Sequence, residues 1–182
     1  YTIQKLHNKY IKSYIQTAMK LTKNINLLTK KEFLSIFGNI FEKSDWIANK
    51  VFDLKPFKNS KDLVIKMMNI YENSTNEKII EIFNLHPKLV IEKKLTSFSS
   101  KEQIEAKLNT CSKEELEEFE YLNKDYQKKF GFPFIIAVKG KNKNEILENF
   151  RKRVKNNFEI EFKEAKTQVK RIASLRFDEI LK

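Results

Sequence analysis

The sequence is poor in the residues that interrupt regular structure. Its 182 residues include only three glycines and three prolines. An all-β fold needs frequent turns, so this scarcity argues against one and favours long helices. The sequence therefore predicts an all-α fold, a single-domain bundle of roughly eight helices spanning residues 1–182.

Cysteine and histidine are equally scarce. The one cysteine, Cys111, excludes an internal disulfide and indicates a reducing compartment, so we expect a cytoplasmic protein. The two histidines, His7 and His86, are far apart in the chain. With one cysteine they do not reach the spacing of a metal-ligand cluster, so we expect no metal.

Several common functional motifs are missing as well. Three glycines cannot build a glycine-rich phosphate loop, and the sequence contains no serine-nucleophile motif. No run of apolar residues reaches the length that a membrane span requires, so we expect no membrane insertion.

Basic residues are abundant, and the formal net charge is +12. Such a charge fits a helical module that binds nucleic acid or another anionic partner. It also fits a chain that is simply rich in lysine. Only four of the 36 basic residues are arginines, and the lysines are scattered along every predicted helix. Nucleic-acid sites rely heavily on arginine, so the composition argues against nucleic acid.

Apolar residues recur at helical spacing along most of the chain. Serine or threonine three residues before glutamate, as at Thr29 and Ser112, marks several helix starts. The predicted helices cover about residues 3–21, 30–37, 45–52, 61–71, 77–85, 99–108, 113–130, 145–155 and 158–173.

His86 stands at the junction of two of these helices. Pro87 disfavours the α conformation at His86, so the preceding helix must end at about Leu85. At a helix C-terminus the dipole favours the charged imidazolium. Ser99 and Glu102 form a capping pattern at the start of the next helix. A base and a carboxylate at facing helix ends could form a polar site, although each could serve only as a helix cap.

An extended segment is predicted after the helix that ends at Gly131. The sequence Phe130-Gly131-Phe132-Pro133-Phe134 continues as Ile135-Ile136-Ala137-Val138, which has the composition of a strand. No second convincing strand is present to pair with it. The segment is therefore either a buried extended pocket wall with amides available to a ligand, or an apolar linker through the core.

Taken in order, these motifs resemble a known family. The resemblance is carried by Phe37-Gly38, Phe41-Glu42-x-Ser44-x-Trp46-Ile47-Ala48, Lys55-Pro56-Phe57, His86-Pro87-x-Leu89, Ser99-x-x-Glu102-Gln103, Leu122-Asn123-x-x-Tyr126, Lys129-Phe130-Gly131-Phe132-Pro133-Phe134-Ile135-Ile136 and Arg153-Val154-x-Asn156. Over residues 27–180 the chain resembles the 2-oxo-4-hydroxy-4-carboxy-5-ureidoimidazoline (OHCU) decarboxylases. Residues 1–26, a predicted N-terminal helix, lie outside the match.

The resemblance implies an all-α carboxy-lyase that works without a cofactor. Its substrate would be OHCU, which it would convert to (S)-allantoin in the ureide pathway of urate breakdown. It implies catalytic roles for His86, Glu102 and Arg153. The implied substrate-binding residues are Pro87, Ser99, Gln103, Phe134, Ile135 and Ile136. The resemblance also allows a homodimer. The alternatives are the basic binding module described above and a family member that has lost catalysis.

The residue types suit this chemistry. When CO₂ leaves, the conjugated imidazoline ring can delocalise the remaining electron pair. His86 is a natural proton shuttle near neutral pH. Arg153 could grip an anionic or ureido oxygen with two hydrogen bonds, and amides near Phe134 could stabilise a developing oxyanion. Glu102 could orient the substrate hydroxyl or repel the leaving carboxylate, and the sequence leaves both roles open.

The chain departs from the family pattern in two places. Lys88-Leu89-Val90-Ile91 stands where the family usually has Asp-Leu-Ala-Gly, and Ile104-Glu105-Ala106-Lys107 replaces a run of small residues that includes glycine. The loss of these glycines predicts a narrower or reshaped pocket.

Overall fold

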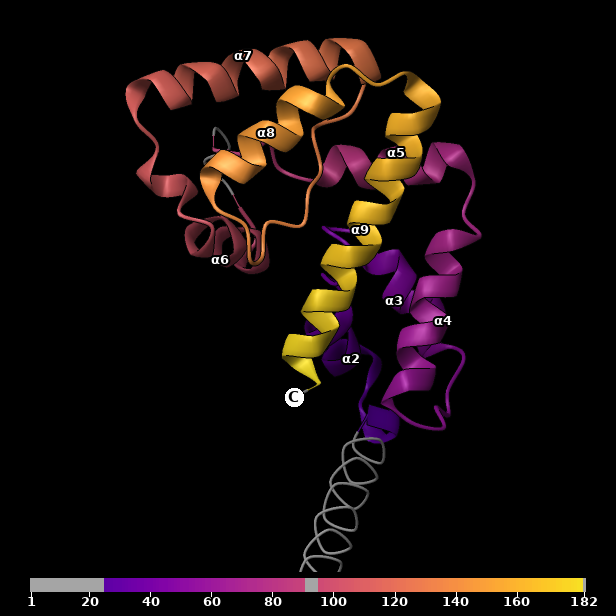
Figure 1. Ribbon diagram of the computed structural model, residues 1–182. Coiled ribbons are helices and arrows are strands. Elements are labelled where there is room, and N and C mark those ends of the chain that lie inside the picture. Colours follow the sequence, from indigo (N-terminus) through magenta and orange to yellow (C-terminus); the bar gives the residue numbers. More distant parts are fainter. Residues whose placement is uncertain (1–24, 91–94, 182) are drawn as a thin grey trace, which may run out of the picture. The chain divides into compact units, whose positions relative to one another are not determined.

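The computed structural model describes residues 25–90 and 95–181, and the regular structure in these ranges is entirely helical. This confirms the all-α prediction. The predicted helix over residues 3–21 lies outside the described residues. The helices are α2 (Lys30–Phe37), α3 (Asp45–Phe52), α4 (Ser60–Glu72), α5 (Asn76–Leu85), α6 (Ser97–Glu105), the short 3-10 helix η1 (Leu108–Thr110), α7 (Lys113–Phe130), α8 (Lys143–Arg153) and α9 (Phe158–Ile180) (Figure 1).

The described chain forms two compact units. The first contains α2, α3 and α4, and the second contains α5 to α8 and nearly all of α9. A short piece of chain between α2 and α3, Phe41–Lys43, belongs to the second unit. The candidate site described below is built entirely from the second unit.

An aromatic cluster at Phe33 organises the first unit. Thr29 caps α2 in a reciprocal capping box with Glu32, as the sequence pattern predicts. This start places Phe33 on the buried face, where its ring lies 4.8 Å from that of Phe37 and 5.9 Å from that of Phe57. Helix α3 packs against both α2 and α4.

In the second unit, the helix ends around the candidate site follow local rules with one exception. Helix α5 ends at Leu85, and His86 has extended geometry with ψ of 138°, as a residue before proline requires. Helix α6 begins earlier than predicted. Its N-cap is Thr96, whose hydroxyl accepts from the Ser99 amide at 3.3 Å. The prediction that Ser99 caps this helix is therefore wrong, and Glu102 lies inside it.

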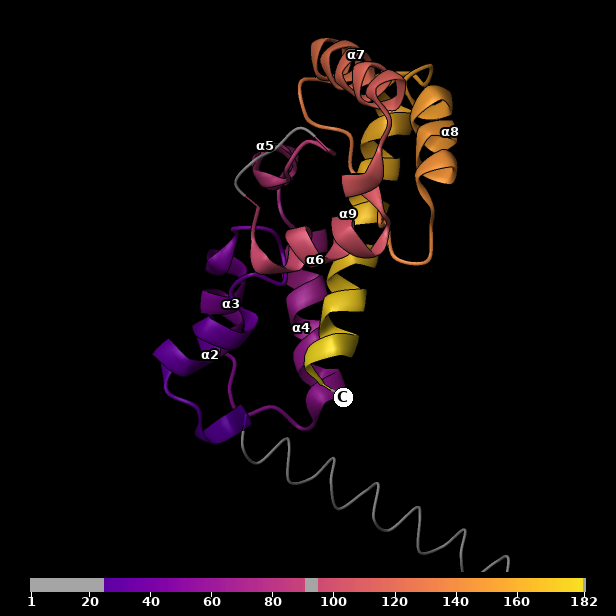
Figure 2. The same cartoon turned by 90° about the vertical axis from the view of Figure 1, so that its left-hand side faces the viewer.

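The segment from Phe132 to Val138 is buried along its whole length and lies outside any helix or strand. It follows α7, which Gly131 terminates with φ of 78°, in the left-handed region. Side chains of the same unit bond to two of its backbone groups: the Ala137 amide donates to Gln168 Oε1 at 2.9 Å, and the Ile135 carbonyl accepts from Arg153 at 2.8 Å. Helices α7 and α8, on either side of this segment in the sequence, lie side by side in Figures 1 and 2.

Candidate functional site

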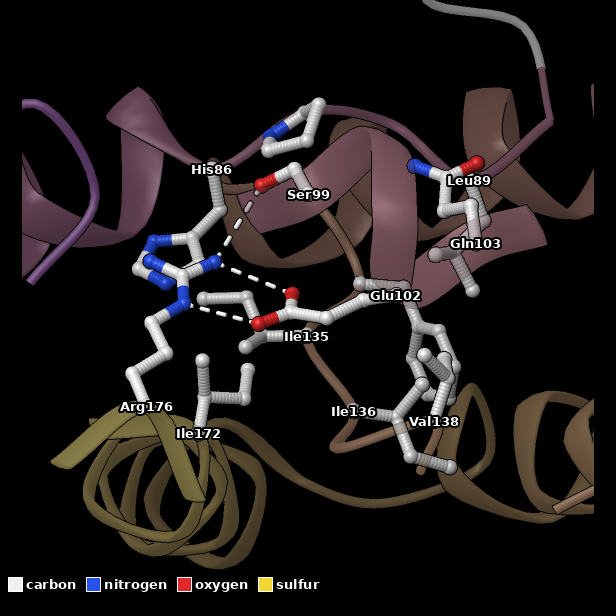
Figure 3. Close-up of a pocket in the computed structure, with 12 residues that line it drawn as sticks. His86, Leu89, Ser99, Glu102, Gln103, Ile135, Ile136, Val138, Ile172 and Arg176 are labelled. Atoms are coloured by element: carbon white, nitrogen blue, oxygen red, sulfur yellow. Dashed lines mark hydrogen bonds and ion pairs between the residues drawn. The ribbon is translucent and has the colours of Figure 1, made fainter. Parts of the chain in front are cut away.

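A pocket in the second unit gathers residues from four parts of the chain (Figure 3). Helix α5 ends in it, α6 and α9 supply polar side chains, and the extended segment forms a wall. The pocket is lined by His86, Pro87, Leu89, Ser99, Glu102, Gln103, Phe134, Ile135, Ile136, Val138, Ile172 and Arg176. All the residues predicted from the sequence to form the site are among them except Arg153.

Arg176 of α9 is the central cation of this pocket. It forms a two-pronged ion pair with Glu102: Nε donates to Oε1 at 2.8 Å and Nη2 donates to Oε2 at 3.0 Å. Nη2 also donates to Ser99 Oγ at 3.2 Å. In Figure 3 the side chain rises from α9 toward Ser99 and Glu102. Only 2% of it is exposed, so the guanidinium is fixed where a ligand could meet it.

A second carboxylate, that of Glu42, also pairs with Arg176. Its Oε2 lies 2.9 Å from Arg176 Nη2 and accepts a hydrogen bond from Ser99 Oγ at 2.8 Å. Burial alone would raise the pKa of Glu42. Arg176, His86 and hydrogen bonds from Ser99 and Thr96 more than offset this effect, and the pKa is lowered. Glu42 is therefore ionised at neutral pH and pairs with the guanidinium.

The two carboxylates keep Arg176 charged in a buried place. Burial would lower its pKa, but hydrogen bonds and charges from Glu102 and Glu42 dominate, and the pKa is raised.

His86 is neutral at physiological pH. Burial lowers its pKa to about 4, although the nearby charge of Glu42 acts in the opposite direction. The expectation that the helix dipole would favour an imidazolium is therefore wrong, because desolvation outweighs the dipole. Nδ1 lies 2.9 Å from the Ile82 carbonyl oxygen. A carbonyl can only accept, so Nδ1 carries the proton and the lone pair is on Nε2. Nε2 has no hydrogen-bond partner among the described residues.

The structure does not bring Arg153 to this pocket. Its guanidinium is buried in a separate ion pair, with Nε 2.9 Å from Glu161 Oε1, and Nη1 donates to the Ile135 carbonyl at 2.8 Å. It also lies over the Phe134 ring, 4.5 Å from its centroid. The prediction that Arg153 converges with His86 and Glu102 is thus wrong. Its contacts instead hold the extended segment whose other side lines the pocket.

Gln103 supports the pocket through the backbone of the chain after Pro87. Its Oε1 accepts from the Val90 amide at 3.1 Å, and Val90 has a positive φ of 69°. This bond fixes the turn that presents Leu89 to the pocket. Val90 is one of the residues that replace the small residues expected here.

Sequence reasoning missed both Arg176 and Glu42. Arg176 continues the helical pattern of α9, and nothing local distinguishes it from an ordinary basic residue. Its one signal is arginine scarcity, since only four arginines occur in the chain. Glu42 belongs to a motif that the sequence singled out, but its partner Ser99 is 57 residues away.

This arrangement offers three functions in one partly apolar enclosure. The guanidinium can bind an oxyanion, a carboxylate can accept from a substrate hydroxyl or amide, and a neutral imidazole can take up a proton. Leu89, Val138 and Ile172 supply apolar lining, which strengthens these polar interactions by excluding water. Among the described residues, no group of three histidine, cysteine, aspartate or glutamate side chains could hold a metal ion.

Comparison with known proteins connects this pocket with one enzyme family. A family model described as OHCU decarboxylase matches residues 26–178. The uric acid degradation bifunctional protein of a Bacillus species is 37% identical over 164 residues, which cover 90% of this chain and 33% of that protein. The 2-oxo-4-hydroxy-4-carboxy-5-ureidoimidazoline decarboxylase of Haloferax volcanii is 34% identical, over 85% of this chain and 92% of that protein.

Solved structures give the same result. A crystal structure of (S)-allantoin synthase superposes with a TM-score of 0.69 at 28% identity, over 87% of this chain and 53% of that one. A crystal structure of OHCU decarboxylase in the presence of (S)-allantoin gives 0.65 at 25% identity, over 79% and 95%. The chain spans about a third of the length of the bifunctional bacterial relatives, with 33% and 32% of the two proteins covered.

Proposed function

Because the chain belongs to the OHCU decarboxylase family, we propose that it converts 2-oxo-4-hydroxy-4-carboxy-5-ureidoimidazoline to (S)-allantoin and CO₂ without a cofactor. The observation that carries this proposal is the meeting of His86, Glu102 and Arg176 in one pocket. The reaction belongs to urate breakdown, the process named for the bifunctional bacterial relatives.

Arg176 is proposed to bind the anionic substrate. A guanidinium matches a carboxylate or a ureido oxygen with parallel hydrogen bonds. Glu102 occupies this position through its own two-pronged pair with Arg176. Binding therefore requires Glu102 to exchange the guanidinium for a substrate donor, such as the hydroxyl on the carbon that loses CO₂.

His86 is proposed to act as the proton shuttle. The bond to the leaving carboxylate breaks, CO₂ departs, and the electron pair enters the conjugated ring. The lone pair of Nε2 is available to take the hydroxyl proton, and the resulting imidazolium can return a proton to one face of the ring. Overall the anion loses CO₂ and gains one proton from solvent. Because His86 delivers the proton from one fixed side of the ring, a single enantiomer forms.

The pocket wall is proposed to select and shield the ring. Pro87, Ser99, Gln103 and the segment Phe134–Ile136 surround the polar group. Exclusion of water strengthens the guanidinium contact as charge spreads into the ring and protects the intermediate from protonation on the wrong face.

We also propose that the protein works in a reducing compartment such as the cytoplasm, since its one cysteine cannot form an internal disulfide. A homodimer is the assembly that the family resemblance allows. Burial raises the pKa of the Cys111 thiol, which favours its protonated form. No helix of the described ranges is long and apolar enough to cross a bilayer. Sedimentation equilibrium measures the oligomeric state directly.

The test is the optical activity of the product. OHCU is generated in place from urate by the preceding enzymes, and circular dichroism follows allantoin formation with and without the purified protein. The expected result is faster formation of (S)-allantoin than the spontaneous decay, which gives the racemate. A racemic product formed at an unchanged rate would contradict the decarboxylase proposal and favour a family member without catalysis.

A further inference from the structure

We propose that Glu42 is a positioning residue: a fixed counter-ion that holds Arg176 in place while Glu102 exchanges the guanidinium for substrate. This inference rests on the proposed function for its kinetic consequence, but the geometry that supports it is independent of the reaction. Glu42 belongs to a motif of the family, but its side chain does not line the pocket.

The two carboxylates that bind Arg176 differ in their access to solvent. The Glu42 side chain is fully buried, whereas 25% of the Glu102 side chain is exposed. Glu42 also accepts from Ser99 Oγ at 2.8 Å, and Ser99 in turn accepts from Arg176 at 3.2 Å. Glu42 is therefore tied to the guanidinium both directly and through a hydroxyl, and a substrate cannot reach it.

This difference gives the two glutamates separate roles, with Glu42 as the fixed partner of Arg176 and Glu102 as the partner that exchanges. When Glu102 turns to a substrate, a guanidinium held by Glu102 alone would lose its anchor and its neutralising charge. Leaving a buried charge unpaired is costly, so such an exchange would be slow or would not occur. The contacts of Glu42 and Ser99 remain through the exchange and keep Nη2 in place. Arg176 then meets the substrate already oriented, which is the condition for efficient electrostatic stabilisation.

Removing the charge of Glu42 also changes the competition for Arg176. Glu102 on α6 and Arg176 on α9 are the charged groups that line the pocket, and the extended segment contributes apolar side chains to it. Without Glu42, the pair between Glu102 and the guanidinium loses its competitor and becomes tighter. A substrate must then displace a stronger ion pair, so its apparent affinity falls.

The kinetic test compares Glu42→Gln with Glu42→Asp. Glu42→Gln keeps the shape but removes the charge, and we expect KM to rise by about tenfold or more, with a smaller change in kcat. Glu42→Asp keeps the charge and should recover most of that loss. The matched control is Glu118→Gln, which removes a carboxylate paired in the same two-pronged way with Arg151 at the surface. An unchanged KM in correctly folded Glu42→Gln would overturn the proposal.

A second measurement needs neither substrate nor folded Glu42→Gln. In Glu102→Gln, with Glu42 intact, the side-chain nitrogen resonances of Arg176 are followed by NMR. We expect restricted rotation of the guanidinium, since Glu42 and Ser99 still hold Nη2. Free rotation would show that Glu42 is no anchor and would refute the assignment. Because this readout involves no turnover, it separates failure of the positioning role from failure of the decarboxylase proposal.

Discussion

Glu102 has two possible roles that predict opposite effects of one substitution. A capping-box glutamate contributes about 0.5–2 kcal/mol to stability and nothing to turnover. The structure instead places Glu102 inside α6, bonded to Arg176 rather than to a helix N-terminus. We therefore expect Glu102→Ala to lower turnover by a factor on the order of 10² or more, because the substrate loses the acceptor that orients it.

The melting temperature of the same Glu102→Ala sample completes that test. It should change little, because Glu42 and Ser99 still neutralise and hold Arg176. Normal turnover combined with a lower melting temperature would mean that Glu102 is structural.

Arg176 and Arg153 offer a matched pair of substitutions. Each is a buried arginine paired with a buried or half-buried glutamate, but only Arg176 lines the pocket. A lysine keeps the charge and loses the planar fork. We expect Arg176→Lys to abolish most turnover, and Arg153→Lys to lower stability by about 1–3 kcal/mol while retaining most turnover per folded molecule.

Measuring kcat/KM and denaturant midpoints on both lysine variants separates the two roles. If Arg153→Lys were the inactive variant and Arg176→Lys the active one, the geometric assignment of the binding arginine would be wrong.

At the scale of single residues, the sequence predicts effects between neighbours in the chain but not contacts between residues that are far apart in the sequence. His86 and Pro87 could be placed because a proline acts on its immediate neighbour. Glu42 and Arg176 could not be placed against Ser99, because the contacts join residues 57 and 77 positions apart. The charge state of His86 was predicted wrongly for the same reason: the dipole is a local effect, while burial depends on the whole fold.

At the scale of elements, types could be predicted more reliably than boundaries. Every predicted helix within the described ranges is present, and the segment after Gly131 is non-helical. The start of α6 was predicted too late because Thr96, Ser97, Ser99 and Ser100 all suit an N-cap. Only packing selects Thr96. No spacing rule could have shown that the Ile135 carbonyl is held by Arg153.

The turn after Pro87 contains a strained residue. Val90 has a φ of 69°, a conformation that is costly for a β-branched side chain, by about 1–3 kcal/mol. Glycine adopts it freely, so Val90→Gly should be neutral or stabilising by about 1 kcal/mol. The control is Val154→Gly, at a half-buried valine with an ordinary φ of −59°, which should destabilise by about 1 kcal/mol. Urea denaturation of both variants measures these changes in the free energy of unfolding. Equal losses would show that Val90 is not strained.

At the scale of the whole molecule, the buried His86 makes stability depend on pH. Its pKa falls from 6.5 in the unfolded chain to about 4 in the folded protein. The unfolded state therefore binds more protons between these values, and stability falls as pH decreases through this window. Its contribution is complete above pH 6.5. Lowering the pH from 7 to 5 should cost about 2 kcal/mol through this group.

Chemical denaturation at pH 7 and pH 5 measures this loss, and His86→Gln supplies the comparison. The variant should lose markedly less stability than the wild type over the same interval. Identical losses would place the pH sensitivity elsewhere.

The net charge of +12 leads to a separate expectation. If the charge reflects lysine-rich composition, the protein should cause no gel shift of duplex or single-stranded nucleic acid at low salt. Binding through many phosphate contacts would instead appear as an affinity that falls steeply with salt. A salt-sensitive shift would support the basic-module alternative.

The contacts of Arg176 also have a consequence for the order in which the folded structure forms. Its partners Ser99 and Glu102 lie 77 and 74 residues earlier in the chain. Helices form within about a microsecond, whereas contacts across such separations must await the closure of long loops. A refolding chain therefore forms its helices before it assembles the pocket. Until α9 docks, Glu42 and Glu102 lack the cation that they share in the folded protein, and the pocket is incomplete.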